Sequence, residues 1–397
     1  MSILDAPAVA ARPAWLALDK LGVLIALIAG AGAALPFTLF RANRIVPGEP
    51  VALLDALPPT PSILLAGILL IGFAIALLRF PVAAKLVAGF IALAGLFVGV
   101  GWSASYLTPE GNTFARVSPG AGFWLLSFAF ALLVTDALTR LRFPPLIRIA
   151  ILLLVCLAMA GLLWSGAWND LSILREYATR APAFWAEGRT HIALAFGSVA
   201  IATVAGIPLG ILCYKVASLR AGVLNVLNII QTIPSIALFG LLIAPLAWVA
   251  ANVPGASAAG ISGIGTAPAM VALFAYSLLP IVSNTVVGLL SVSPAAVDAA
   301  KGMGMTGSQR LFTVELPLAF PVILTGIRIV LVQNIGLATI AALIGGGGFG
   351  VFVFQGIGQT AMDLVLLGAV PTVALAFAAA VVLDAVVETV SRGGRTA

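Results

Sequence analysis

Residues whose side chains can act as acids, bases, nucleophiles or metal ligands are scarce in this sequence. Its 397 residues include one histidine, His191, and two cysteines, Cys156 and Cys213, and only 9% of the residues are charged. Neither a Ser/His set nor a pair of catalytic carboxylates can be assembled from so few groups, and no metal-binding cluster is in sight. The sequence therefore predicts a protein that binds or moves other molecules, with no catalytic residues, no metal and no cofactor of its own.

One polar segment is far more regular than the rest. It reads Asp298-Ala-Ala-Lys-Gly-Met-Gly304 and ends in Val314-Glu-Leu-Pro317. Ser293-Pro294 is a preferred pair for an N-cap and first helical residue, and Thr306-Gly-Ser-Gln309 has the capping-box pattern. We expect two short helices along a membrane surface, the first broken at Gly302 and Gly304 and the second interrupted at Pro317.

The residue types in this segment suit the approach of another protein. Ala299 and Ala300 are small enough to let a second backbone come close, and Gly304 permits a sharp turn without conflict from a Cβ atom. Met303 and Met305 offer an adaptable apolar surface. From the residues alone, a docking site and a merely structured connection between two spans remain equally open.

A few polar residues lie inside otherwise apolar segments, where they are costly and often mark a transport pathway. Each could equally make a hydrogen bond between helices. The candidates for a substrate pathway are Gln231, Ser283, Asn284, Gln333 and Asn334.

The elements that position these residues are predicted to be membrane helices. Hydrophobic residues make up 62% of the chain, and residues 221–297 and 329–362 contain no charge. A span needs about 20 apolar residues and must be helical in lipid. The fold class is therefore all-α, a polytopic membrane bundle of about ten helices. The apolar segments lie at 21–40, 62–80, 83–101, 121–139, 146–166, 191–215, 223–250, 267–290, 321–343 and 362–390.

Lys and Arg are distributed unevenly between the two sides of such a bundle. With the Asp298 segment in the cytoplasm, thirteen lie inside and six outside, which agrees with the positive-inside rule and puts both termini in the cytoplasm. Arg328 belongs to neither group and can reach the cytoplasmic interface by snorkelling. The inner set is Arg12, Lys20, Arg79, Lys85, Arg140, Arg142, Arg148, Lys215, Arg220, Lys301, Arg310, Arg392 and Arg395; the outer set is Arg41, Arg44, Arg116, Arg175, Arg180 and Arg189.

The chain divides near residue 170. Residues 1–170 form an extension of five spans, 171–190 a periplasmic interfacial segment, and 191–397 a core of five spans that contains the regular segment at 294–320. The first apolar stretch is favoured as an uncleaved span over a secretory signal, because Asp5 and Asp19 precede it.

The spacing of the regular segment resembles a family motif. Asp298-Ala-Ala, three residues, Gly304, nine residues and Val314-x-Leu316-Pro317 is similar to the EAA loop of permease subunits in binding-protein-dependent ABC importers, with Asp for Glu and Val for Ile. Segments such as Gln231-Thr-Ile-Pro-Ser, Gly263-Ile-Gly-Thr-Ala-Pro268 and Ala341-Ala-Leu-Ile-Gly-Gly-Gly-Gly-Phe-Gly350 resemble the osmoprotectant branch, which carries glycine betaine, choline and related solutes. The resemblance covers roughly residues 190–390, and the preceding half looks like the longer members with extra N-terminal spans.

This resemblance implies a set of partners. The loop, with Asp298, Ala299, Ala300, Gly304, Val314, Leu316 and Pro317, would dock on a cytoplasmic ATP-binding subunit present in two copies, which holds the ATP and Mg. A second permease subunit, either the same or a different chain, and a periplasmic solute-binding protein would complete the importer in the bacterial inner membrane. The fold implied is the permease core of a type I ABC importer.

Other functions are weighed against this one. The same machinery could import amino acids or other organic cations. The core spans show no obvious aromatic cage for a quaternary ammonium group, so selectivity is expected to reside in the separate solute-binding protein. An ion-coupled secondary transporter would need acidic or histidine residues at mid-membrane. Gly345-x-Gly347-x-x-Gly350 matches a dinucleotide motif but lacks its strand–helix context, so a tight turn is preferred. Scattered basic residues argue against nucleic acid.

Overall fold

The computed structural model describes residues 18–43, 46–109, 111–112 and 114–393. Arg12, Arg44 and Arg395 of the orientation count lie outside these residues, as do both chain ends and the side chain of Arg392. The chain forms two compact units. The first comprises Met1–Pro144 with Val155–Arg175, and the second comprises Pro145–Leu154 with Glu176–Ala397.

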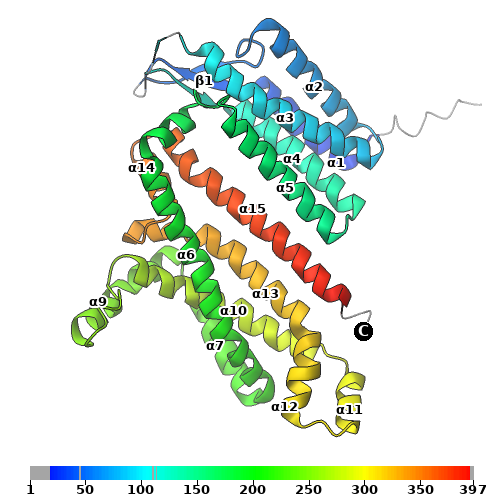
Figure 1. Cartoon of the computed structure of the whole chain (residues 1–397), viewed down its shortest axis with the longest axis vertical. Coiled ribbons are helices and arrows are strands. Elements are labelled where there is room, and N and C mark those ends of the chain that lie inside the picture. The colour runs from blue at the N-terminus through cyan, green and yellow to red at the C-terminus, as the bar shows by residue number, and fades with distance from the viewer. Residues whose placement is uncertain (1–17, 44–45, 110, 113, 394–397) are drawn as a thin grey trace, which may run out of the picture. The chain divides into compact units, whose positions relative to one another are not determined.

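The first unit is a bundle of four helices with a small sheet (Figure 1). α1 packs on α2 and α4, and α3 packs on the same two helices, so the four surround one core. Phe37, Phe123, Phe130, Leu96 and Leu133 fill that core and are almost fully buried. The antiparallel sheet has the order β2-β1-β3. The elements are α1 (Lys20–Ala34), β1 (Thr38–Arg41), β2 (Glu49–Val51), α2 (Pro59–Leu77), α3 (Val82–Leu107), β3 (Arg116–Pro119) and α4 (Ala121–Leu141).

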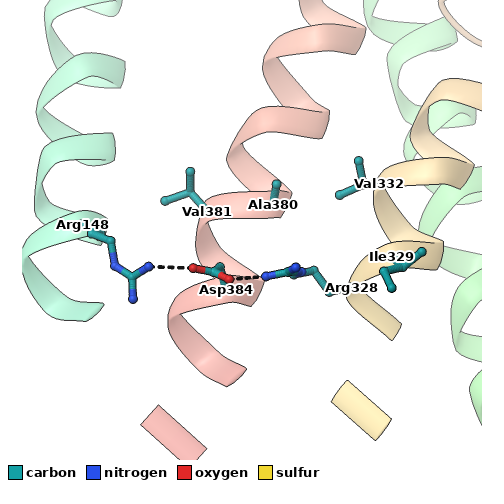
Figure 2. Close-up of a pocket in the computed structure, with 7 residues that line it drawn as sticks. All are labelled: Arg148, Arg328, Ile329, Val332, Ala380, Val381 and Asp384. Carbon is teal, nitrogen blue, oxygen red and sulfur yellow. Dashed lines mark hydrogen bonds and ion pairs between the residues drawn. The ribbon is translucent and has the colours of Figure 1, made fainter. Parts of the chain in front are cut away.

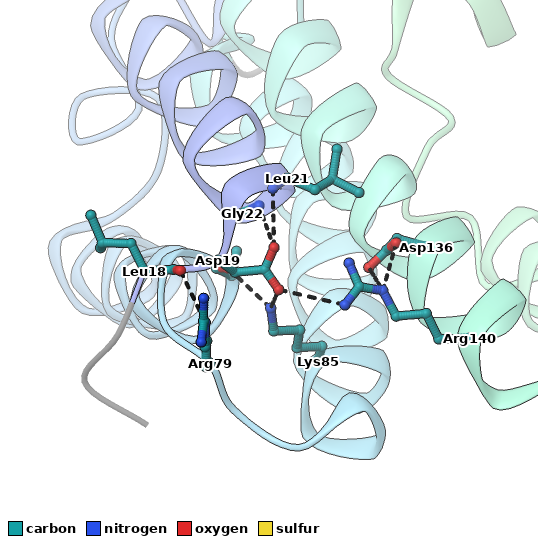
Figure 3. A network of polar contacts seen from close by, with 9 residues as sticks. Leu18, Asp19, Leu21, Gly22, Arg79, Lys85, Asp136 and Arg140 are labelled. Atoms are coloured by element: carbon teal, nitrogen blue, oxygen red, sulfur yellow. Dashed lines mark hydrogen bonds and ion pairs between the residues drawn. The ribbon is translucent and has the colours of Figure 1, made fainter. Parts of the chain in front are cut away.

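A charged clasp closes one end of this bundle (Figure 3). Asp19 caps α1, accepting hydrogen bonds from the backbone N–H groups of Leu21 and Gly22, and its other oxygen receives the Lys85 ammonium of α3 at 2.8 Å. Arg140 of α4 lies 3.6 Å from the same carboxylate. Burial alone raises the pKa of Asp19, but the hydrogen bond from Lys85, the backbone N–H of Gly22 and the two nearby cations outweigh it and lower the pKa. The clasp therefore joins three helices of the unit.

The prediction of a first span over residues 21–40 is wrong at its end. α1 has 15 residues and stops at Ala34, and Thr38–Arg41 forms β1 instead. Pro36 explains the change, because proline disfavours helix in the residue before it. At 1.5 Å per residue, α1 is about 22 Å long, shorter than the roughly 30 Å hydrocarbon layer.

The second unit contains the remaining helices. α5 (Pro145–Trp164) and α6 (Ser172–Lys215) each begin or end in the first unit, and the rest belong wholly to the second. α10 packs on α7 and α13, and α15 packs on α13 and α14. The further elements are α7 (Ala217–Thr232), α8 (Ser235–Leu241), α9 (Ile243–Asn252), α10 (Thr266–Leu290), α11 (Pro294–Gly302), α12 (Gly307–Arg310), α13 (Leu316–Leu337), a 3₁₀ turn (Ile340–Ile344), α14 (Gly350–Gly358) and α15 (Met362–Gly393).

Glycines let these helices approach closely. A Cβ atom on Gly206 of α6 would lie 2.8 Å from Ile281, and one on Gly210 would lie 2.6 Å from Thr285, both on α10. On the other side of α10, a Cβ on Gly326 of α13 would lie 2.8 Å from Asn284. Small residues at four-residue spacing are the usual contact surface between membrane helices. α6, α10 and α13 are therefore packed too tightly at these points for independent sliding.

The helices agree with most of the predicted spans. Within the described residues, nine helices are long and apolar enough to cross a membrane, with α1 as a shorter apolar helix. The predicted span at 223–250 is not continuous, because α7 ends at Thr232 and α8 begins after Pro234. Pro234 breaks the helix, because it lacks an N–H and disfavours helix in the residue before it. Residues 172–190 continue into the next span as one 44-residue helix, α6.

Candidate coupling site

The first short helix of the regular segment, α11, is built as its sequence predicts. The Ser293 side chain caps it by accepting a hydrogen bond from the N–H of Ala296 at 3.3 Å, and Pro294 is the first helical residue. The proline costs nothing there, because that N–H has no partner inside the helix. α11 then runs for nine residues to Gly302.

Gly304 ends α11 in a specific way. Its φ is +77°, and its N–H donates to the Lys301 carbonyl at 2.9 Å while the N–H of Met305 donates to the Ala300 carbonyl at 3.2 Å. These two bonds form a Schellman motif, whose left-handed position strongly favours glycine. A Cβ atom on Gly304 would meet no atom within 4 Å. The glycine is therefore required by the backbone, and the space beside it is open.

The second short helix is not separate from the span that follows. Thr306 and Gln309 form the predicted capping box, which starts α12. The chain then passes through a π-helical turn at Leu311–Glu315 directly into α13. The predicted interruption at Pro317 is wrong. The wide turn places Pro317 in the first turn of α13, where its missing N–H does little harm.

The π turn also creates an ion pair that the sequence analysis did not find. The Arg310 guanidinium donates to the Glu315 carboxylate at 2.5 Å, and the Glu315 side chain is 2% exposed. Residues five apart do not face each other on an α-helix but do so when one π turn lies between them. Spacing rules for α-helices therefore gave no signal for this pair.

The base of the loop is anchored in the second unit. Leu311 packs with Leu289 of α10 and with Ala319 and Ile323 of α13, and Tyr214 of α6 lies against the same cluster. A Cβ atom on Gly288 would lie 2.9 Å from the Ala319 carbonyl oxygen, so α10 and α13 nearly touch here. The base of the loop is therefore in direct contact with three membrane helices, α6, α10 and α13.

The outer surface of the loop has no partner within the described residues. Met303 is 70% and Phe312 is 60% exposed, which is unusual for apolar side chains on a polar segment. Asp298 and Lys301 form an exposed ion pair at 3.0 Å. Ala299 is exposed between them, whereas Ala300 is buried in the loop itself. Of the other motif residues, Val314 and Leu316 are half-buried and Pro317 is exposed.

The predicted pathway residue Gln231 has a clear structural task. Its Nε2 donates to the Tyr276 carbonyl at 2.8 Å, which is the acceptor left without a helical donor because Pro280 has no N–H. In return, the Tyr276 hydroxyl donates to the carbonyl of Ile233 at the break before Pro234. Gln231 and Tyr276 thus each donate to a backbone carbonyl next to a proline break, one in α10 at Pro280 and one at the end of α7 before Pro234. A pathway role for Gln231 stays a prediction.

The remaining pathway candidates lie on α10 and α13 but do not gather in one place. Asn334 is fully buried, and its amide donates to the hydroxyls of Ser198 and Ser277 at 2.8 Å each, which joins α13 to α6 and α10. Ser283 and Asn284 are half-buried and both donate to the Pro280 carbonyl, and Gln333 is half-buried. Their role in the pathway likewise stays a prediction.

The glycine run beyond α13 is a tight turn, as predicted. Gly345, Gly347 and Gly348 all have positive φ. The Glu187 carboxylate of α6 accepts the N–H of Gly348 at 2.6 Å and so holds the turn. Glu187 stands far away in the sequence, and nothing in its surroundings indicated this contact.

Two family models match the chain. Residues 206–395 match the "Binding-protein-dependent transport system inner membrane component", and residues 19–174 match the "ABC transporter permease YehY, N-terminal domain". The osmoprotectant import permease protein OsmW of Salmonella typhimurium is 43% identical over 194 residues, which is 49% of this chain and 83% of OsmW. The chain belongs to the permease subunits of binding-protein-dependent ABC importers.

Other relatives of this permease carry similar names. The glycine betaine/carnitine/choline transport system permease protein OpuCB of Bacillus subtilis is 36% identical over 186 residues, covering 47% of this chain and 78% of OpuCB. Among solved structures, an inward-facing form of the MetNI methionine ABC transporter is 24% identical with a TM-score of 0.46, covering 53% of this chain and 95% of that chain. The matching family model and the named relatives are membrane permease subunits, so this chain is a transport subunit and not an enzyme, and ATP hydrolysis in its family belongs to a separate subunit.

Proposed function

We propose that residues 294–320 are the coupling loop that docks this permease on its ATP-binding subunit. The observation that carries the proposal is the outer surface of α11, where both helix ends are fully capped yet Ala299, Met303 and the nearby Phe312 stay exposed. A helix that needs no further backbone partner but presents small and apolar side chains is suited to lie in a groove of another protein.

The packing below the loop supports a mechanical role. α12, the π turn and α13 follow one another without a break in the helix. A displacement of the loop would therefore be transmitted directly to α13. Glycine contacts hold α10 tightly against α13, and α6 tightly against α10. ATP-driven closure of two docked ATP-binding subunits would then rock two permease subunits and alternate access to the pathway between them, whether the second permease is the same or a different chain.

The orientation proposed from the sequence fits this role. It places the coupling loop and both termini in the cytoplasm of a cell whose inner membrane holds the permease, and the Gly345–Gly350 turn on the periplasmic side with the solute-binding protein. Lys85, Arg140 and Arg148, which the positive-inside rule assigns to the cytoplasm, all lie near helix ends.

The proposed solute is an osmoprotectant such as glycine betaine or a related quaternary ammonium compound. The names of the relatives support this class, and so do the core segments that resemble it. Amino acids or other organic cations are the alternative. Calorimetric titration of the partner solute-binding protein with glycine betaine, choline and amino acids distinguishes the two. Binding of amino acids alone would reject the osmoprotectant assignment and leave the coupling loop untouched.

The coupling role is tested by Gly304→Trp in the reconstituted importer. The indole would project into the open space beside α11 where the partner must approach, so we expect transport-linked ATP hydrolysis to fall to background while the protein remains in the membrane. Gly161→Trp is the control, because a Cβ atom at Gly161 on α5 also meets no atom within 4 Å. Full stimulation of Gly304→Trp by solute-loaded binding protein would reject the docking assignment.

A further inference from the structure

α7 has two faces of opposite character. On one face, Leu227 is buried together with Val282 and Val286 of α10. The opposite face is exposed and mostly small or polar. Each of its residues has a neighbour three or four positions away, so they form one stripe along the helix. The polar stripe comprises Ser218, Ala221, Gly222, Asn225, Asn228, Ile229 and Thr232, with Val226 exposed at its edge.

The two asparagines of the polar stripe have no partner of their own. Neither the Asn225 nor the Asn228 amide makes a hydrogen bond to any residue that the structure describes, and both side chains are exposed. Gln231, on the buried side of the same helix, instead donates to the Tyr276 carbonyl. Each asparagine amide therefore still offers two N–H donors and one oxygen acceptor.

The end of α7 lies near the middle of a membrane-crossing helix. α10 is long and apolar enough to span a bilayer. Tyr276 lies 276−266 = 10 residues from its start and 290−276 = 14 residues from its end, which is about 15 Å and 21 Å. The hydrogen bonds of Tyr276 with Gln231 and with Ile233 hold the end of α7 at this level.

The rest of α7 follows the second half of α10. Leu227 packs with Val282 and Val286, which lie between Tyr276 and the end of α10. Asn225 and Asn228 stand on either side of Leu227 in the sequence, so they lie within the hydrocarbon layer. An amide without a hydrogen bond is strongly unfavourable in an apolar surrounding. The polar stripe therefore does not face lipid.

The break after α7 indicates that this side holds water. No described donor reaches the backbone carbonyls of Gln231 and Thr232, because the chain turns to an extended conformation at Ile233. Both Thr232 and Pro234 are exposed. At membrane depth, irregular backbone is found where it is buried in protein or lines a water-filled cavity. Since this break is not buried within the described residues, a water-filled cavity is the better fit.

The charged groove of the same unit differs from the polar stripe (Figure 2). Asp384 accepts hydrogen bonds from both Arg148 and Arg328. Arg148 also pairs with Glu388. Two arginines and two carboxylates thus balance one another there, whereas the amides of α7 still need a ligand.

We propose that the polar stripe of α7, up to the break before Pro234, lines the water-filled solute pathway, with Asn225 and Asn228 in contact with the passing solute. Residues 221–297 contain no charge, so a solute is held weakly enough to be released. The carbonyl end of a helix carries partial negative charge and suits a cationic group. The proposal rests on the proposed import function but not on the docking of residues 294–320.

The test is cysteine labelling of the assembled importer in liposomes. Cys156, an exposed native thiol, is first replaced by serine. A charged methanethiosulfonate on both sides of the membrane should label Asn225→Cys and Asn228→Cys about tenfold faster than Val204→Cys, because it reacts with the thiolate, which forms in water. Val204 is the matched control, since it is 76% exposed on an apolar part of α6 and lies 215−204 = 11 residues from the end of that helix.

Two results would overturn the proposal. Equal labelling rates at positions 204, 225 and 228 would mean that the polar stripe lies in lipid. A disulfide between two permease copies at position 225, without labelling by the reagent, would mean that the stripe is a contact between subunits.

Asn228→Leu tests contact with the solute. The leucine has a similar size but no hydrogen-bonding groups, and the site is exposed, so the protein should remain folded. Uptake should fall about fivefold, the effect of one lost hydrogen bond, while a photoreactive residue at Met303 still crosslinks to the ATP-binding subunit. Failure of that crosslink in the wild type would reject the docking assignment alone and leave the labelling pattern unchanged.

Ile229→Leu is the control on the same stripe and should leave uptake unchanged, because it removes no polar group. Unchanged uptake in both Asn225→Leu and Asn228→Leu would overturn the proposal. A loss in Ile229→Leu as large as that in Asn228→Leu would refute contact through the amides.

Discussion

Two Lys–Asp pairs in this permease have nearly the same length and opposite surroundings. Lys85 and Asp19 are 2.8 Å apart with side chains 3% and 12% exposed, while Lys301 and Asp298 are 3.0 Å apart with side chains 55% and 71% exposed. The first pair joins α1 and α3 of the N-terminal bundle, and the other groups that contact Asp19 also belong to that bundle (Figure 3). The second lies on α11, where one side chain is only three residues from the other.

The difference shows that burial, and not distance, decides what an ion pair contributes. A buried pair is strongly destabilising to break, because one charge remains without a partner. An exposed pair adds little, since water solvates both groups. The clasp around Asp19 is thus complete by itself, whereas the charges of α11 remain available to another protein.

The largest effect is expected in the clasp. Lys85→Met leaves the Asp19 carboxylate buried beside Arg140 alone and should lower the free energy of unfolding by about 3 kcal/mol. Thermal unfolding in detergent measures this loss. The double variant with Asp19→Asn should recover much of it, because no charge is then left unpaired. If the single variant is as stable as the wild type, the clasp does not hold the bundle.

An intermediate effect is expected at the end of α11. Gly304→Ala forces a side chain into the left-handed region and should cost about 1 kcal/mol. Gly302→Ala is the matched control, because it adds the same methyl group two residues earlier, where φ is not positive and no atom lies within 4 Å. Equal stabilities of the two variants would mean that the Schellman turn does not depend on glycine.

The smallest effect on stability is expected at the exposed pair. Lys301→Met should change the free energy of unfolding by less than about 0.5 kcal/mol. The same variant should still reduce stimulation of ATP hydrolysis in the assembled importer, because it alters the docking surface. A loss of stability comparable with that of Lys85→Met would erase the contrast between the two pairs.

The sequence predicted the local structure of residues 293–309 well because its signals are local. The Ser293 cap, the Thr306–Gln309 capping box and the Gly304 turn each depend on residues within a few positions of each other, and the structure confirms all three. The length and apolar character of the main spans were predictable for the same reason.

Contacts that depart from the α-helical spacing, and contacts between distant residues, were not predictable. The π turn at Leu311–Glu315 precedes Pro317 and brings Arg310 to Glu315. Sequence patterns based on the α-helical period of 3.6 residues do not predict such a turn. Gln231 completes a hydrogen bond that Pro280 leaves open some fifty residues away, and Glu187 holds a turn after Gly345. β1 replaced the end of the first predicted span because it pairs with β2 and β3.

The docking assignment is tested most directly by photo-crosslinking in the assembled importer. A photoreactive residue at Met303, on the exposed side of the coupling loop, should crosslink to the ATP-binding subunit. The same residue at Leu343, which is 48% exposed and lies beyond the other end of α13, should not. Crosslinking of the ATP-binding subunit from position 343 and none from position 303 would contradict the account.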